Sequence, residues 1–236
     1  MCIKEQFRVL QGPCGNGGRY KISAVKRPIL IGSIPVFSLD SLERKIKDSE
    51  GICDLVELRL DYMREVDPKI LELLKPFAGR CILTLRSRDE GGINYFPDHI
   101  REAFLSKAVR DGFMVDVELA TSLRTGIKPF ISSMHFLRKL PERSALSGLV
   151  EKARSMGKHV KIAYVPSPNS RSTMVRILEE SENLSIMEIG SSPESRIAFS
   201  LLGSEMIYCH LGDPTASGQM ECSRAVKIID CIWRSL

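Results

Sequence analysis

The chain has 236 residues, of which 43% are hydrophobic and 27% are charged, and its formal net charge is +5. This composition is typical of a globular protein and excludes a wholly disordered chain. The positive charge is uneven, because residues 1–27 hold six basic residues and one acidic residue, whereas the remainder is neutral. A neutral body argues against a broad surface for nucleic acid.

The chain contains no stretch of about 18 apolar residues, so we expect no membrane-spanning helix. The N-terminus lacks the apolar core of a secretory signal. The seven cysteines form no CxxC pair, and none has a histidine at zinc-ligand spacing. An odd number of scattered cysteines indicates no disulfide framework and a reducing compartment. We therefore predict a cytoplasmic protein without a metal site.

Residues 1–27 precede the main repeat of the chain. Two extended segments, Phe7–Gln11 and Arg19–Val25, flank the glycine-rich stretch Gly12–Gly18, which has the composition of a turn. We predict a β-hairpin here rather than a phosphate loop, because a phosphate loop should lead into a helix. This division gives a basic extension at 1–27 and one domain at 28–236.

The domain at 28–236 alternates short β-like runs with stretches of helical periodicity. Helical stretches include Leu39–Ile46, Ile100–Val109 and Ala225–Trp233. This alternation predicts a parallel sheet, and eight such units predict a single-domain (β/α)₈ barrel. An open doubly wound sheet is the alternative, although its usual dinucleotide fingerprint is absent. The predicted strands are Ile29–Ser33, Leu55–Leu60, Cys81–Leu85, Phe113–Leu119, Pro129–Met134, His159–Val165, Leu184–Ile189 and Met206–His210.

Charged residues alternate with apolar residues in the second predicted strand. Because alternate side chains of a strand point to opposite faces, Glu57, Arg59 and Asp61 share the face that a barrel turns inward. Buried charge is costly unless it is paired, and barrel enzymes keep their chemistry at the carboxyl ends of the strands. Charged or polar residues recur at this place in other units, namely Arg86, Glu90, Asp116, Glu118, His135 and Lys161. Together they predict a site.

Lys161 indicates which chemistry the site performs. A lysine in an apolar strand is desolvated, and its neutral amine can attack a carbonyl to form a Schiff base. His135, at the end of the preceding strand, can take and return a proton. The alternatives are a lysine that reaches solvent from a strand edge and a structural histidine.

Arginines at positions 59, 86 and 196 suit a carboxylate or another anion. The last loop, Thr215–Gln219, offers hydroxyls and an amide for a polyol. These parts predict a Schiff-base enzyme that acts on a hydroxylated keto acid.

These motifs together resemble the type I 3-dehydroquinate dehydratases over about residues 28–236. The matching motifs are Glu57-Leu58-Arg59-Leu60-Asp61, Leu85-Arg86-Ser87, Glu90-Gly91-Gly92, Asp116-Val117-Glu118, Ser133-Met134-His135, Lys161-Ile162-Ala163, Ser195-Arg196-Ile197 and Thr215-Ala216-Ser217-Gly218-Gln219. The resemblance implies a (β/α)₈ barrel with an N-terminal hairpin beneath it. It also implies a cofactor-free dehydration of 3-dehydroquinate to 3-dehydroshikimate in the shikimate pathway, often by a homodimer.

The resemblance also implies roles for individual residues. Lys161 would form the imine, His135 would move protons, and Glu90 would orient His135. Arg196 would hold the substrate carboxylate. The substrate-binding positions by this resemblance are Ser33, Glu57, Arg59, Arg86, Arg196, Thr215 and Gln219.

Three places depart from the family pattern. Phe136-Leu137 follow the histidine, Ser217 stands where a proline is common, and the segment 187–194 does not align cleanly. Two other functions fit the residues: a class I aldolase, and a non-catalytic barrel that binds a small acid. The aldolase would need a glycine-rich phosphate site in the last units, for which Gly212-Asp213-Pro214 is a poor match.

Overall fold

The computed structural model describes residues 26–235, so the predicted N-terminal hairpin lies almost entirely outside the described residues. Within that range, strands and helices alternate from Ile29 to Trp233. The strands form one parallel sheet in the order β7-β6-β5-β4-β3-β2-β1-β8, which curls into a nearly closed barrel. The predicted (β/α)₈ architecture is confirmed. The strands are β1 Ile29–Pro35, β2 Leu55–Arg59, β3 Cys81–Thr84, β4 Met114–Glu118, β5 Ile131–Phe136, β6 His159–Tyr164, β7 Leu184–Glu188 and β8 Met206–His210.

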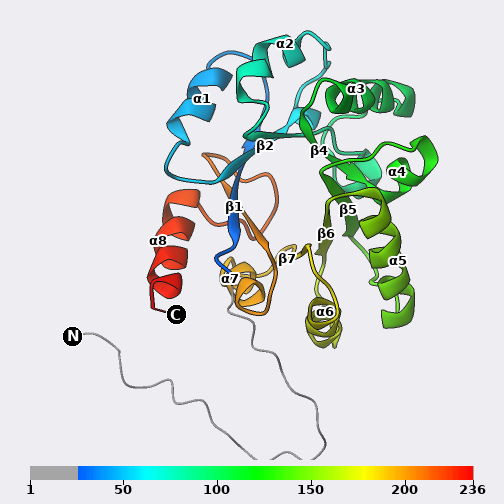
Figure 1. Cartoon of the computed structure of the whole chain (residues 1–236), viewed down its shortest axis with the longest axis vertical. Helices are drawn as coiled ribbons and strands as arrows, with labels where there is room; N and C mark the ends of the chain where they lie inside the picture. The colour runs from blue at the N-terminus through cyan, green and yellow to red at the C-terminus, as the bar shows by residue number, and fades with distance from the viewer. Residues whose placement is uncertain (1–25, 236) are drawn as a thin grey trace, which may run out of the picture.

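The helices lie outside the strands (Figure 1). Short 3-10 turns at Leu60–Tyr62, Lys75–Phe77 and Arg88–Glu90 follow β2, α2 and β3. No helix in the described part of the chain is both long enough and apolar enough to span a bilayer. The helices are α1 Leu42–Asp48, α2 Ile70–Leu74, α3 Asp98–Arg110, α4 Leu119–Thr125, α5 Arg143–Met156, α6 Ser170–Glu179, α7 Glu194–Leu201 and α8 Cys222–Trp233.

Each strand has one apolar face against the helices and one face toward the barrel interior. In β2, Val56 and Leu58 belong to the core beneath the helices, as their alternation predicts. The interior holds a smaller apolar cluster that includes Ile31, Ile82 and Ile131. Polar residues of the interior therefore gather nearer the carboxyl ends of the strands.

The barrel has one seam, between β7 and β8, which no regular ladder joins. Side chains bridge this seam: Met206 N donates to Ser185 Oγ at 2.9 Å, and Ile186 N donates to Ser204 Oγ at 3.0 Å. A backbone hydrogen bond from Glu205 N to Leu184 O, at 3.1 Å, adds to them. Serine hydroxyls thus satisfy backbone donors that a ladder would otherwise serve.

Two element boundaries differ from the sequence prediction in ways that affect the site. Strand β2 ends at Arg59, so Asp61 lies in the 3-10 turn that follows rather than in the strand. Strand β5 extends to Phe136, which places His135 inside the strand instead of just beyond it.

The structure also differs from the expectation drawn from cysteine spacing. Cys209 in β8 and Cys222 at the start of α8 form a disulfide, with Cα atoms 5.0 Å apart. Spacing alone does not determine which cysteines meet, and here the return of the chain from β8 to α8 brings them together.

Candidate active site

A pocket opens at the carboxyl ends of the strands, where the sequence predicted a site. Its floor comes from inward-facing strand residues and its rim from the loops after β3 and β8. The lining residues are Glu57, Arg59, Arg86, Glu90, Gly91, His135, Leu137, Lys161, Ala163, Met187, Ile189, Arg196, Tyr208, Thr215, Ala216 and Gln219.

Lys161 lies in the barrel interior and is 5% exposed, because its neighbours Val160 and Ile162 occupy the apolar face of β6. This burial contradicts a lysine that reaches solvent from a strand edge. Its Nζ lies 2.9 Å from Asp116 Oδ2 and 3.5 Å from Glu57 Oε1. The amine is therefore held at a fixed place on the pocket floor.

His135 pairs with Glu90, which lies in the 3-10 turn after β3. Glu90 Oε2 lies 2.8 Å from His135 Nδ1 and also accepts a hydrogen bond from the His135 backbone N–H at 3.1 Å. Burial raises the pKa of Glu90 to about 7. Burial, together with the charges of Arg86 and Lys161, holds the pKa of His135 well below its usual value. The imidazole is thus neutral near neutral pH, and with Nδ1 bound to Glu90 its Nε2 can act as a base.

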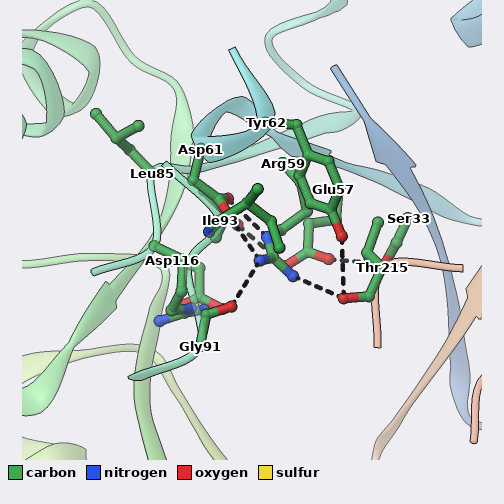
Figure 2. Close-up of polar contacts among 12 residues, drawn as sticks. Ser33, Glu57, Arg59, Asp61, Tyr62, Leu85, Gly91, Ile93, Asp116 and Thr215 are labelled. Carbon is green, nitrogen blue, oxygen red and sulfur yellow. Dashed lines mark hydrogen bonds and ion pairs between the residues drawn. The ribbon is translucent and has the colours of Figure 1, made fainter. Parts of the chain in front are cut away.

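Arg59 and Arg86 reach the pocket already paired with carboxylates. Arg59 donates to both oxygens of Asp61 at 2.8 Å, and it lies beside the carbonyl oxygens of Gly91 and Thr215 (Figure 2). Arg86 lies 2.8 Å from Asp116 Oδ1 and 3.3 Å from Glu118 Oε1. A guanidinium already paired with a buried carboxylate has little uncompensated charge for a ligand.

Arg196 differs from these two arginines, because it has no carboxylate partner among residues 26–235. Its Nη1 donates to the backbone oxygen of Tyr208 at 2.9 Å and its Nη2 to that of Ser217 at 3.4 Å, while its Nε has no partner within that range. The side chain comes from α7 and crosses the seam to β8. Burial lowers the pKa of Arg196 to about 10. A buried, uncompensated cation is suited to an anionic ligand.

The loop after β8 places polar groups at the pocket rim. Gln219 Oε1 accepts hydrogen bonds from the backbone N–H groups of Thr215 and Ala216 at 2.7 and 3.1 Å. Gln219 Nε2 lies 3.3 Å from Ser33 Oγ, which in turn donates to Glu57 Oε2 at 2.7 Å. The loop is thereby attached to β1 and β2 across the pocket.

The predicted site residues line the pocket except Ser33, which lies buried in β1 and contacts Glu57 and Gln219. The structure also adds residues that were not predicted. Met187 and Ile189 line the pocket, in the segment that resisted alignment to the family pattern. Asp116 was predicted to face inward, but its contact with Lys161 was not predicted. Tyr208 was missed altogether, although alternation along β8 would place it inward with Met206 and His210.

The fold and the pocket define a (β/α)₈-barrel enzyme with its chemistry at the carboxyl ends of its strands. A model of the family described as Type I 3-dehydroquinase matches residues 32–234, and the chain belongs to this family.

Relatives agree with this membership. The chain is 36% identical over 205 residues to a 3-dehydroquinate dehydratase of Sulfolobus acidocaldarius, covering 86% of this chain and 93% of that protein. It is 35% identical over 211 residues to the one of Metallosphaera sedula, covering 89% and 100%. Among solved structures, the fold resembles the 3-dehydroquinate dehydratase of Geobacillus kaustophilus with a TM-score of 0.71 and 20% identity, covering 88% of this chain and 91% of that one.

Proposed function

We propose that this protein dehydrates 3-dehydroquinate to 3-dehydroshikimate, the hydro-lyase step of the shikimate pathway, through an imine on Lys161. The observation that carries this proposal is a buried lysine in the same pocket as a histidine–carboxylate pair and an arginine without a carboxylate partner. Family membership supplies the substrate.

Imine formation begins when the Lys161 amine attacks the ring ketone. An ammonium and a ketone give a protonated imine and one water, so the nitrogen ends with a single N–H and a positive charge. That charge draws electrons from the adjacent carbon and makes its C–H acidic. Asp116 and Glu57 hold the nitrogen where this attack starts.

His135 then moves the protons. Its Nε2 removes the proton from the carbon next to the imine, giving an enamine. The enamine expels the hydroxyl group of the ring, which leaves as water after it takes the proton back from His135. Glu90, bonded to Nδ1, holds the imidazole in the tautomer that this cycle needs. Water finally hydrolyses the imine and regenerates Lys161.

Arg196 binds the substrate carboxylate in this proposal, since its guanidinium is buried and forms no ion pair with a carboxylate among the described residues. Thr215 and Gln219 face the ring hydroxyls from the rim, and Ser33 supports Gln219 and Glu57 from β1. Glu57, Arg59 and Arg86 shape the polar wall beside them. A ligand bound there would lie beneath the loop after β8.

Borohydride trapping tests the proposal. Incubation with 3-dehydroquinate and borohydride should leave a covalent adduct on Lys161, located by peptide mass spectrometry, and Lys161→Ala should lose both adduct and turnover. Lys158→Ala is the matched control, because Lys158 lies exposed just before the same strand and should leave both unchanged. Binding without an adduct in the parent protein would instead indicate a non-catalytic barrel that binds a small acid.

We also propose that the protein works as a homodimer, as the family resemblance implies, and that it acts in the cytoplasm, as expected of an enzyme of a biosynthetic pathway. Light scattering coupled to size exclusion should give twice the mass of one chain, and fractionation of the native cells should recover the activity with cytoplasmic markers. A monomer that turns over at the full rate would contradict the first part.

A further inference from the structure

Tyr208 lies on the pocket floor beside the proposed nucleophile. Its ring lines the pocket, and Lys161 Nζ lies 4.0 Å from the ring centroid, within cation–π range. Together with Asp116 and Glu57, the ring forms a third contact around this nitrogen. Tyr208 is only 2% exposed, so its position is set by packing.

The hydroxyl of Tyr208 is buried and has no hydrogen-bond partner among residues 26–235. Burial, and then the carboxylates of Glu57 and Asp116, hold the pKa of this phenol well above its usual value. The group is therefore an un-ionised O–H donor, and its ring contacts the nitrogen to which both carboxylates bind. A buried donor without a partner is destabilising, which calls for an explanation by function or by another state of the site.

Tyr164 shows how this chain treats a buried tyrosine away from the pocket. It lies on β6, faces the helices and is fully buried. Its hydroxyl donates to Glu188 Oε1 at 2.9 Å. The unpartnered hydroxyl of Tyr208 is thus not a general feature of buried tyrosines in this protein.

Imine formation changes the number of donors on the pocket floor. The ammonium of Lys161 has three N–H groups and serves both Asp116 and Glu57. When the ammonium and the ketone form a protonated imine and water, the nitrogen retains one N–H. One carboxylate contact must then be lost or taken over by another donor.

We propose that Tyr208 is a positioning residue whose hydroxyl takes over the carboxylate that Lys161 releases when the imine forms, while its ring supports the nitrogen in both states. This inference rests on the proposed function. In the resting protein the hydroxyl makes no hydrogen bond to the described residues. In the covalent intermediate it donates to Glu57 or Asp116. The hydroxyl of Tyr208 therefore stabilises the covalent intermediate and does not affect the initial binding of substrate.

The test compares Tyr208→Phe with Tyr164→Phe, which remove one buried hydroxyl each. Four quantities are measured: the midpoint of thermal unfolding, the Kd of a substrate analogue whose ring ketone is reduced to an alcohol, the rate of borohydride trapping, and kcat. Such an analogue binds without forming an imine, so its Kd reports encounter alone.

Tyr208→Phe should keep or raise the unfolding midpoint, because it removes a buried donor without a partner. It should keep the analogue Kd and lower kcat and the trapping rate by about tenfold, the loss of one hydrogen bond to a charged group. Tyr164→Phe should do the reverse, lowering the midpoint and keeping kcat. A parent-like Tyr208→Phe, or one that loses analogue affinity by the same factor as kcat, would overturn the inference. A parent protein that neither traps nor turns over the keto acid would overturn the proposed function, and this inference with it.

Discussion

Arg196 is the residue of this pocket whose charge is best placed to bind an anionic ligand. The other arginines that line the pocket are paired with carboxylates, so their charges are compensated before a ligand arrives. Arg196 donates only to backbone oxygens, among the residues described, and keeps its Nε free. A buried cation of this kind destabilises the empty protein. Its retention makes sense when a ligand carboxylate supplies the missing charge.

Replacing Arg196 should therefore separate binding from stability. We expect Arg196→Gln to raise KM for 3-dehydroquinate roughly 10- to 100-fold, the loss of a charge-assisted hydrogen bond, without lowering the free energy of unfolding. Arg101→Gln gives the contrast, because Arg101 is buried against Glu118, and breaking that pair should cost roughly 3–5 kcal/mol of stability. Urea unfolding and initial rates measure both. A marked loss of stability in Arg196→Gln would show that its charge is compensated in the free protein.

At the scale of elements, the loop between β8 and α8 is the segment on which the pocket rim depends. It carries Thr215 and Gln219, and it begins and ends near Cys209 and Cys222, whose disulfide joins the strand to the helix. The disulfide therefore closes a ring of chain around the loop that covers the pocket. Fixing both ends of a loop limits the conformations its tip can adopt, in the unfolded chain above all.

Loss of this disulfide should weaken the protein and loosen the rim. For a closed loop of this size the disulfide contributes about 3 kcal/mol, which corresponds to a fall of roughly 6–12 °C in Tm for a chain of this length. We expect Cys222→Ser, or a strong reductant, to lower Tm by that amount and to raise KM several-fold. Cys231→Ser is the control, because Cys231 is an exposed free thiol. Equal Tm values for the Cys222 variant and the parent would contradict a stabilising disulfide.

A local sequence pattern predicts which way side chains face when polar and apolar residues alternate along the element. The alternation around Glu57 and the apolar neighbours of Lys161 predicted inward-facing side chains, and the structure confirms both placements. The burial of Arg101 in α3 was not predicted, because one inward-facing arginine does not change the apolar periodicity of a helix. The contact between Lys161 and Asp116 was not predicted either, since it joins β6 to β4 over the intervening β5 and depends on the order of the strands in the sheet rather than on local pattern.

At the scale of the whole molecule, the neutral charge of the body reflects pairing inside the barrel. Arg86, Asp116, Glu118 and Lys161 are all buried, and each lies within ion-pair distance of an opposite charge. Such a network needs both signs in near balance, because an unpaired charge there would be costly. The excess of basic residues at 1–27 lies almost wholly outside the described part of the chain.

The opposite end of the barrel contains a second polar connection, which closes the seam. His159 Nε2 in β6 lies 2.7 Å from Ser185 Oγ in β7, and the same oxygen accepts from Met206 N in β8. These contacts connect three strands where no ladder joins β7 to β8. In a neutral imidazole, Nε2 can accept the hydrogen bond of the serine hydroxyl. Burial lowers the pKa of His159 to about 4, which keeps it neutral over most of the working range.

This histidine should make the barrel sensitive to acid. In the unfolded chain its pKa is about 6.5. Between about pH 6.5 and pH 4 the unfolded state therefore binds a proton that the folded state does not bind. The stabilisation is complete above about pH 6.5 and is lost as the pH falls toward 4, by up to about 3 kcal/mol. We expect His159→Gln, which keeps a hydrogen-bonding group for Ser185, to reduce the fall in the free energy of unfolding between pH 7 and pH 4.5. His99→Gln, at an exposed position in α3, should behave like the parent protein. If both variants lose stability as steeply as the parent, the seam histidine does not set the acid limit, and other groups must bind the protons that unfold the barrel.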